Sequence, residues 1–410
     1  MNKYSTHTQF LDIWISKIPA HWQAHKMKHL FSERSEKGYP NEPLLVASQN
    51  MGVVPKNVYG NRTVEAQKDL HLLKLVRVGD FVISLRSFQG GLEYAYYQGI
   101  ISPAYTILIP HEPMSGSYFR YLAKSKPFIG LLTLCVTGIR EGQNIDYAKL
   151  KNHLLPVPPR EEQDQIVRFL DWKVSNINKL INIKKKEIKA IDALKRSMVS
   201  HAITRGLTTD APMKYSGVKW LGDIPQRWYT VPLYAIAQVK SINNCIDLPL
   251  MSVYLDAGVV PFVEREEKRT NATSKDVTNY QRVDPGDFVL NNQQAWRGSV
   301  GVSFHSGIVS PAYIVLSLDN TLDSHYANYL FRSRCMVDQY LVISRGVGSI
   351  QRNLYWSALK RVVVPIPSKK EQMEIVEYLD GLNNKFDDTI KKLTEEVAVL
   401  EEYKNKIIAD

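Results

Sequence analysis

Two short polar segments carry side chains that could hydrogen-bond to the edges of DNA bases. Residues 86–89 read Arg-Ser-Phe-Gln, and residues 291–297 read Asn-Asn-Gln-Gln-Ala-Trp-Arg. In the major groove an arginine can bind guanine, and an asparagine or glutamine adenine, through two hydrogen bonds, each good pair giving about 1–3 kcal/mol of discrimination. For any single residue, an ordinary solvated loop is the alternative. The candidate contacts are Arg86, Ser87, Gln89, Asn291, Asn292, Gln293, Gln294 and Arg297.

In a second pair of polar segments, the two segments partly resemble each other in sequence. One member contains Arg140, Gln143 and Asn144, and the other contains Arg345, Gln351, Arg352 and Asn353. Because phosphate contacts position a protein on DNA without reading its sequence, this partial likeness favours phosphate contacts as much as base contacts. Weaker candidates are Ser48, Gln49 and Asn50, with Tyr254 at the equivalent place.

The members of each pair belong to the two copies of a tandem duplication. Four ordered matches support it, at offsets between 206 and 209: residues 14–22 with 220–228, 79–83 with 286–290, 99–105 with 307–313, and 156–163 with 365–372. Such internal repetition determines how the whole chain is organised. Residues identical in both copies, such as Gly79 and Gly286, are expected to set turns of a shared scaffold rather than to contact DNA. Polar stretches that differ between the copies are where different bases could be read.

Each copy divides into a mixed part and a long helix. Short apolar runs separated by Gly, Pro and Asn indicate strands and turns with some helix, and acidic residues after proline indicate the start of a helix. The expected fold class is α+β: two similar globular domains separated by two long helices that form an antiparallel coiled coil, with pseudo-two-fold symmetry. The expected domains are residues 1–159, 160–205, 206–368 and 369–410.

Heptad repeats indicate that the two helices pair with each other. Apolar spacing that alternates between three and four residues is typical of coiled coils. Residues 160–205 have a net charge of +5 and residues 369–410 of −4, which favours pairing within the chain over two independent amphipathic helices. The expected seam residues are Leu170, Val174, Ile177, Ile181, Ile188, Ile191, Leu379, Phe386, Ile390, Leu393, Val397 and Leu400.

Four polar residues interrupt this seam: Lys184, Lys195, Asn383 and Lys404. Selection of the helix register is the simpler interpretation, and contact with a partner subunit is the alternative. We favour register selection.

Overall charge suggests a polyanionic partner. The 410 residues have a net charge of +11 and a pI of about 9.2. Residues 1–159 have 18 basic and 11 acidic side chains, so part of the surplus lies in the first globular region. Three scattered cysteines, no apolar signal-peptide core and no run of about 20 apolar residues predict a cytoplasmic protein without membrane contact.

Motifs for common enzyme chemistries do not stand out. We find no P-loop sequence, no zinc-binding His/Cys cluster and no Asn/Asp-Pro-Pro-Tyr/Phe sequence of amino-methyltransferases. Asp256 with Glu266-Glu267-Lys268 faintly resembles the acidic spacing of Mg²⁺-dependent nucleases, but copy one has no counterpart. A nuclease and a coiled-coil scaffold without a DNA role therefore remain as alternative hypotheses.

In its ordered set of motifs the chain resembles the specificity subunit of type I restriction–modification systems. The set comprises the duplicated Ile-Pro-x-x-Trp, Gly-Asp-Phe and Ser-Pro-Ala-Tyr segments, the Pro-x-Pro…Glu-Gln helix starts and the two long helices. Residues 212–225 are especially similar to the opening of the family's second copy. Together these features cover nearly the whole chain.

The resemblance implies a function in DNA recognition without catalysis. Each of two target-recognition domains would read one half of a bipartite, asymmetric site in double-stranded DNA. The helices would set the half-site spacing and bind modification subunits, two being expected. Those subunits would use S-adenosylmethionine to methylate adenine, and separate restriction subunits would use ATP and Mg²⁺; this chain itself is expected to bind no cofactor and no metal.

Overall fold

The computed structural model describes residues 6–59, 69–138, 144–262, 276–347 and 351–409. The chain forms two compact units: residues 1–185 with 395–410, and residues 186–394. Each unit contains one globular region and parts of both long helices. Among the described segments, none of the helices combines the length and apolar character that crossing a membrane requires.

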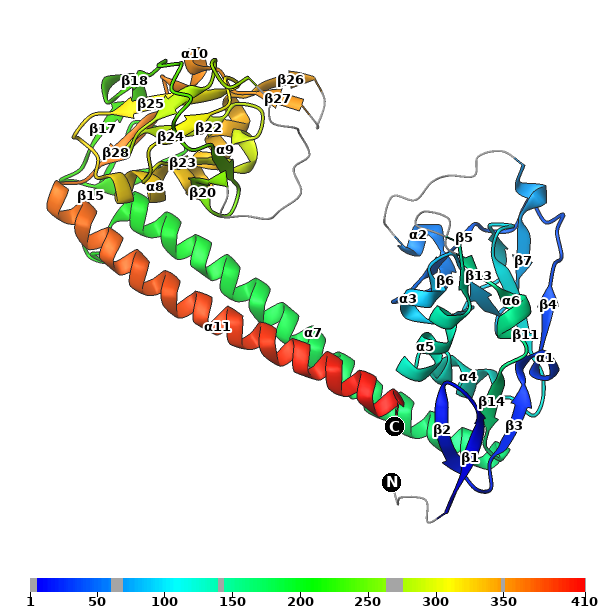
Figure 1. Cartoon of the computed structure of the whole chain (residues 1–410). Helices are drawn as coiled ribbons and strands as arrows, with labels where there is room; N and C mark the ends of the chain where they lie inside the picture. The colour runs from blue at the N-terminus through cyan, green and yellow to red at the C-terminus, as the bar shows by residue number, and fades with distance from the viewer. Residues whose placement is uncertain (1–5, 60–68, 139–143, 263–275, 348–350, 410) are drawn as a thin grey trace. The chain divides into compact units, whose positions relative to one another are not determined.

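In the first globular region a four-stranded antiparallel sheet has the order β4 (Phe31–Arg34), β11 (Thr106–Pro110), β8 (Phe81–Ile83) and β9 (Glu93–Tyr94). Two-stranded antiparallel pairs surround it: β1 (His7–Asp12) with β2 (Ile15–Pro19), β3 (Gln23–Lys26) with β14 (Leu154–Val157), β5 (Leu45–Ser48) with β6 (Gly52–Pro55), β7 (Lys74–Val76) with β10 (Gly99–Ile101), and β12 (Val136–Thr137) with β13 (Asn144–Ile145). Its short helices are α1 (Met27–Leu30), α2 (Lys56–Tyr59), α3 (Ser87–Gly90), α4 (Gly116–Leu122), α5 (Lys126–Leu134) and α6 (Tyr147–Leu150) (Figure 1).

The second globular region repeats this topology. Its four-stranded sheet has the order β18 (Ala237–Val239), β25 (Tyr313–Leu318), β22 (Phe288–Asn291) and β23 (Val300–Val302). The matching pairs are β15 (Met213–Tyr215) with β16 (Asp223–Pro225), β17 (Tyr229–Pro232) with β28 (Val363–Ile366), β19 (Met251–Tyr254) with β20 (Gly258–Pro261), β21 (Gln281–Val283) with β24 (Gly307–Val309), and β26 (Arg345–Val347) with β27 (Gln351–Asn353). Helices α8 (Ser324–Arg332), α9 (Arg334–Ile343) and α10 (Trp356–Leu359) complete it, with a short 3-10 helix η5 (Ala295–Arg297) after β22. The duplication seen in the sequence is therefore a duplication of the fold.

An inner strand of each four-stranded sheet, β8 or β22, separates two apolar cores. Side chains of a strand alternate between its faces, so Phe81 and Ile83 of β8 pack with α4 and α5, while Val82 packs with the β5–β6 hairpin. In β22, Phe288 and Leu290 face the larger core and Val289 the smaller one. The continuous apolar run after each Gly-Asp turn is thus required because both faces of the strand are buried.

Both long helices form as expected and run antiparallel to each other within each unit. Helix α7 spans Arg160–Arg205, and α11 spans Lys369–Ala409. In the first unit Ile177 of α7 packs in a cluster with Val397 of α11. In the second, Ala202 shares a core with Ile375. Because later residues of α7 meet earlier residues of α11, the helices are antiparallel, and they pair within one chain.

Candidate nucleic-acid interface

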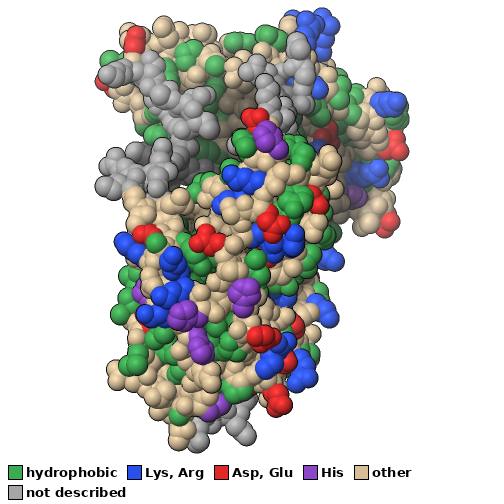
Figure 2. All heavy atoms as spheres, turned by 90° about the vertical axis from the view of Figure 1, so that its right-hand side faces the viewer, with side chains coloured by type: hydrophobic (Ala, Val, Ile, Leu, Met, Phe, Trp, Pro, Cys, Tyr) green, Lys and Arg blue, Asp and Glu red, His purple; other side chains and the backbone are tan. Residues whose placement is uncertain are grey.

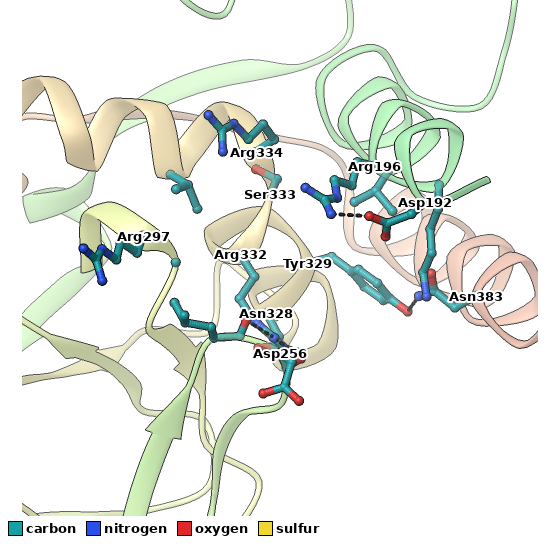
Figure 3. Close-up of a pocket in the computed structure, with 15 residues that line it drawn as sticks. Asp192, Arg196, Asp256, Arg297, Asn328, Tyr329, Arg332, Ser333, Arg334 and Asn383 are labelled. Atoms are coloured by element: carbon teal, nitrogen blue, oxygen red, sulfur yellow. Dashed lines mark hydrogen bonds and ion pairs between the residues drawn. The ribbon is translucent and has the colours of Figure 1, made fainter. Parts of the chain in front are cut away.

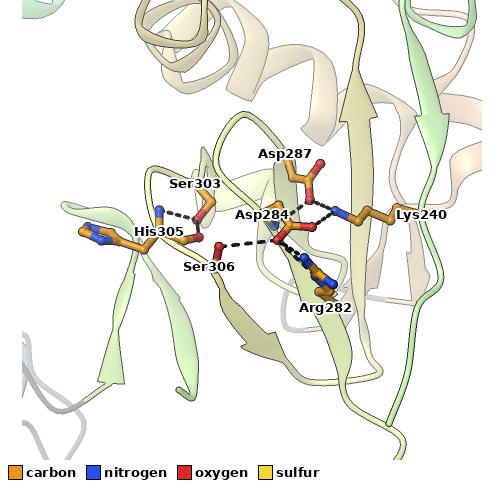
Figure 4. Close-up of polar contacts among 7 residues, drawn as sticks. All are labelled: Lys240, Arg282, Asp284, Asp287, Ser303, His305 and Ser306. Atoms are coloured by element: carbon orange, nitrogen blue, oxygen red, sulfur yellow. Dashed lines mark hydrogen bonds and ion pairs between the residues drawn. The ribbon is translucent and has the colours of Figure 1, made fainter. Parts of the chain in front are cut away.

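A buried ion pair fixes the turn that precedes each candidate reading loop. Asp287 is 4% exposed, and its carboxylate accepts hydrogen bonds from Lys240 Nζ at 2.5 Å and from the backbone N–H of Asp284 at 2.8 Å (Figure 4). Lys240 Nζ also donates to Asp284 at 2.6 Å. In copy one, Asp80 binds the Arg34 guanidinium, with Nε at 2.7 Å. The Gly-Asp segments are therefore scaffold, and the loops begin one strand later.

In copy one the loop after β8 places two of its three candidates in solvent. Arg86 precedes α3 and is exposed, as is Gln89. Ser87 is fully buried, and its hydroxyl accepts a hydrogen bond from the backbone N–H of Ser84 at 2.8 Å. Because that hydroxyl stabilises the turn and lies away from solvent, we leave Ser87 out of the proposed interface.

The turn of the β5–β6 hairpin lies against this loop. Gln49 and Asn50 are exposed there, whereas Ser48 is buried. Gln49 Nε2 donates to the carbonyl of Arg86 at 3.4 Å. Lys124 Nζ joins the two segments, because it donates to the carbonyls of Gln49 at 3.3 Å and Gly90 at 2.9 Å. The weaker candidate Gln49 thus lies beside the stronger candidate Arg86.

Lys124 forms an ion pair with Glu93, which is 1% exposed. Both of its carboxylate oxygens accept from Lys124 Nζ at 2.8 Å. Burial raises the pKa of Glu93 to about 7, although the Lys124 charge opposes the shift. Since the folded pKa lies above the ordinary glutamate value of 4.5, the folded state binds more protons between these pH values, and stability should fall as pH rises through this window.

We therefore expect the free energy of unfolding of the first unit, relative to a Glu93→Gln variant, to fall by roughly 1 kcal/mol per pH unit between about pH 4.5 and 7. Chemical denaturation of both proteins at several pH values measures this difference. Parallel stability curves for the two proteins would contradict it.

In copy two the loop after β22 is held by contacts within the loop itself. Gln293 and Arg297 are exposed, while Asn291, Asn292 and Gln294 are half-buried. The Asn291 side chain accepts from the backbone N–H of Gln293 at 3.2 Å. Asn292 is oriented inward, because its side-chain oxygen is buried. Gln293 and Arg297 are therefore the side chains that are most available to a partner.

An aromatic ring supports Arg297. Its guanidinium carbon lies 4.5 Å from the centre of the Trp296 ring, within the range of a cation–π contact. Trp296 Nε1 in turn donates to the carbonyl of Gln293 at 2.9 Å. The arginine thus projects from a braced loop, which reduces the entropy that a directed hydrogen bond would lose.

Arg332 occupies in copy two the place of Lys124 in copy one. Its Nη2 donates to the carbonyls of Leu255 at 3.3 Å and Asp256 at 2.5 Å, in the turn of the β19–β20 hairpin. Burial lowers the pKa of Arg332, and the nearby Asp256 opposes this shift. Sequence reasoning missed both cations, although each precedes a serine at a constant offset of 208.

The second candidate cluster is only partly described. Asn144 and Arg345 are exposed, and Asn353 is half-buried. Half-buried Arg352 donates from Nη1 to the carbonyl of Leu341 at 3.4 Å. Arg140, Gln143 and the side chain of Gln351 lie outside the described residues.

A backbone contact joins the two clusters of copy two. The N–H of Leu354, just after β27, donates to the carbonyl of Asn292 at 2.9 Å. The hairpin that carries Arg345 and Arg352 therefore adjoins the loop that carries Arg297. Sequence spacing alone could not show this proximity.

A buried glutamine fastens each globular region to the start of its helix. Gln163 in α7 accepts from the backbone N–H of Ser115 at 2.8 Å and donates to the carbonyls of Pro113 and Pro158 at 2.8 and 2.9 Å. Gln372 in α11 repeats this arrangement with Asp323. Both glutamines are fully buried. The duplicated Glu-Gln motif therefore joins each globular region to a helix.

The expected seam residues lie on the less exposed faces of the helices. All of them are buried or half-buried: Leu170, Val174, Ile177, Ile181, Ile188, Ile191, Leu379, Phe386, Ile390, Leu393, Val397 and Leu400. Ion pairs flank the seam, and each joins a lysine of α7 to an acid of α11, as Lys195 does with Asp387 at 2.7 Å. Lys184 pairs with Glu396. This agrees with the opposite net charges of the two helices.

Two of the polar seam residues form hydrogen bonds to uncharged side chains. Lys404 donates to Asn178 at 3.4 Å across the helix pair. Asn383 Nδ2 lies 2.7 Å from the hydroxyl of Tyr329, which donates to Asp380. Asn383 therefore bonds to a side chain of the globular region, a role that the heptad pattern could not indicate.

The acidic spacing that resembled a nuclease cannot be assembled from the described residues. Asp256 lies in the β19–β20 turn, and Glu266-Glu267-Lys268 fall outside the described part of the chain. No group of three or more His, Cys, Asp or Glu side chains that could hold a metal occurs within that part.

Figure 2 shows one face of the molecule with its side chains coloured by type. Lys, Arg and His side chains occur there in small groups, separated by acidic and apolar side chains. Charge alone therefore does not outline an interface on this face, and the loops are defined instead by their hydrogen bonding and exposure.

Comparison with known proteins indicates the same family that the sequence motifs resemble. A family model described as "Type I restriction modification DNA specificity domain" matches residues 225–399. A putative type I restriction enzyme MjaX specificity subunit of Methanocaldococcus jannaschii is 23% identical, over 96% of this chain and 93% of that protein. The type I restriction enzyme MjaVIII specificity subunit of the same organism is 24% identical, over 76% and 73%.

A solved structure shares the fold. It is described as the structural basis underlying complex assembly and conformational transition of the type I R-M system, and its matching chain is 15% identical with a TM-score of 0.65. The match covers 96% of this chain and 98% of that one. The duplicated architecture, the family model over residues 225–399 and the nearly full-length relatives agree, and the chain is similar to the specificity subunits of type I restriction–modification systems.

Proposed function

We propose that this chain is the DNA sequence-specificity subunit of a type I restriction–modification complex and is itself non-catalytic. Each globular region is a target-recognition domain that reads one half of a bipartite, asymmetric site. The observation that carries this proposal is the pairing of a duplicated scaffold with unlike polar loops: Arg86 and Gln89 in copy one, Gln293 and Arg297 in copy two. Scaffolds of the same topology with different side chains at one place suit two readers of different sequences.

The helix pair is proposed to fix the spacing between half-sites. B-DNA repeats about every 34 Å, so two readers of one face must be held at a defined separation. Paired helices are stiff, whereas a flexible linker would allow many separations. The same helices would bind modification subunits, two in our proposal, which would carry S-adenosylmethionine and methylate adenine. Restriction subunits would add the ATP-dependent and Mg²⁺-dependent steps.

Arginine substitutions in the two loops test the assignment of half-sites. Sequencing methylated adenines in cells that carry the intact system first identifies both half-sites. We then expect Arg86→Ala to reduce discrimination at one half-site by about 1–3 kcal/mol and Arg297→Ala to do so at the other, because each removes a possible bidentate contact. Competition binding of the assembled complex to duplexes altered in either half measures both effects.

The matched control is Arg77→Ala, an exposed arginine that pairs with Glu36 at 2.9 Å. It should leave both half-sites unaffected. A scaffold without a DNA role would instead show no change for either loop variant, and cleavage of plasmid by this chain with Mg²⁺ alone would favour the nuclease hypothesis.

A further inference from the structure

A cavity of about 410 Å³ in the second unit lies where the copy-two loops meet the helix pair. Figure 3 shows Asp192 and Arg196 of α7 facing Ser333 and Tyr329 across it. Its charged lining residues are Asp192, Lys195, Arg196, Asp256, Arg297, Arg332 and Arg334. Five of these residues are basic and two are acidic, and Lys195 is also paired with Asp387 outside the lining at 2.7 Å, so the remaining basic surplus of the pocket favours a negatively charged occupant.

Two of these cations are in ion pairs that are readily exchanged. Arg196 pairs with Asp192, and Arg334 pairs with Asp338 at 2.9 Å, each across one helical turn. Their side chains are 63% and 62% exposed. Surface pairs of this kind contribute little to stability. Either arginine can therefore turn toward a stronger anion at small cost.

Arg332 is held in a different way. Backbone carbonyls of Leu255 and Asp256 accept its hydrogen bonds. Carbonyl groups orient the guanidinium without carrying a formal charge that would cancel its own. Arg332 is consequently a positioned cation at the base of the pocket.

Internal comparison indicates what kind of anion would bind. Three cationic lining positions are also basic at the equivalent place in the other copy, although the reading loops differ between the copies. The equivalent residues are Arg332 and Lys124, Arg334 and Lys126, and Lys195 and Lys404. Arg196 differs, because Asn405 takes its place. A charge kept in both copies suits a partner group that does not vary with sequence, which for DNA is the phosphate.

We propose that this pocket binds a phosphodiester group of the DNA backbone beside the half-site read by copy two. Arg297 contributes both to the proposed reading loop and to the pocket lining, so a strand that contacts the loop passes the pocket. Arg196, Arg332 and Arg334 supply the planar donors that suit phosphate oxygens. This inference rests on the proposed function and adds a sequence-independent contact to it.

A double variant, Arg196→Gln with Arg334→Gln, tests the pocket in the chain assembled with its modification subunits. We expect about tenfold weaker binding to cognate and to non-cognate duplexes alike, because charge-assisted hydrogen bonds to phosphate are lost. The slope of log affinity against log salt should decrease by about one. Lys370→Gln is the matched control, since Lys370 is exposed, pairs with Glu374 one turn away and does not line the pocket.

Single methylphosphonate linkages locate the contact on the DNA without altering the protein. In the unaltered complex, one neutral linkage next to the copy-two half-site should weaken binding about tenfold. In the double variant the same linkage should have a smaller effect, because two of the three arginines that would contact this phosphate are already absent. Addition of inorganic phosphate at constant ionic strength should weaken binding by the unaltered protein more than by the variant.

Each other outcome overturns the phosphate pocket. The first is an unchanged salt slope, and the second is a scan in which every linkage has the same effect in the double variant as in the unaltered complex. The third is weaker assembly with modification subunits at unchanged DNA affinity, which would assign the pocket to an acidic protein segment. If the unaltered complex shows no preference for its methylated sequence, the proposed function itself fails, and this result is distinct from the others.

Discussion

Replacement of Asp80 by alanine is expected to lower the free energy of unfolding of the first unit by about 3–5 kcal/mol, because it leaves a buried arginine without its main partner. Asp80 is 2% exposed. Its carboxylate binds Arg34 through Nε at 2.7 Å and Nη2 at 3.2 Å and accepts from the backbone N–H of Arg77 at 2.7 Å. Glu36, which also contacts Arg34, is 38% exposed and compensates only in part.

Hydrogen exchange followed by mass spectrometry measures this loss where it occurs. Protection should fall in peptides of β4, β8 and β11, while the second unit keeps its protection, because it has its own Asp287–Lys240 pair. The control removes both charges together. An Arg34→Met, Asp80→Leu double variant should recover most of the stability, since apolar replacement of a buried pair is often nearly neutral. Equal losses in the single and double variants would show that the ion pair is not the cause.

The overall architecture was predictable because it depends on repeated local patterns. Glycines 79 and 286 have φ values of +97° and +93°, and such turns followed by apolar strands recur at a nearly constant offset. Heptads and opposite net charges predicted that the two helices pair with each other. The two units were not predicted as such, because contacts divide each long helix between them at residues 185 and 394, and heptads carry no information on that division.

The site was less predictable, because its members are joined by backbone atoms. Ser87 is of a residue type that can contact DNA bases, yet its hydroxyl accepts a hydrogen bond from the backbone N–H of Ser84 in the same turn. Gln163 was visible as part of a repeated motif, but its partners Ser115 and Pro113 lie about fifty residues earlier. Lys124 and Arg332 are basic residues at or just after the ends of helices α4 and α8, and no motif in the sequence marks either position. Only their contacts with the hairpin turns bring them to the candidate interface.

Substitution of Gln372 by methionine, which has a similar shape and no amide, should destabilise the second unit by about 3–5 kcal/mol. The Gln372 side chain accepts from the backbone N–H of Asp323 at 2.7 Å and donates to the carbonyls of Thr321 and Pro367, each at 3.0 Å. All three backbone groups would lose this partner at a fully buried position. Hydrogen exchange in α8 and at the start of α11 measures the effect.

Equivalent and neighbouring substitutions make this prediction specific. Gln163→Met should produce a similar loss in the first unit and leave the second unchanged, because Gln163 has the same set of backbone partners in copy one. Met373→Ala alters the adjacent residue of α11, which is 64% exposed, and should change stability by less than about 0.5 kcal/mol. If the glutamines join the reading domains to their helices, Gln372→Met should also reduce discrimination at the copy-two half-site while discrimination at the copy-one half-site persists. A loss of discrimination at both half-sites would instead mean that the variant disturbs the whole chain, and that the glutamine is not a local anchor.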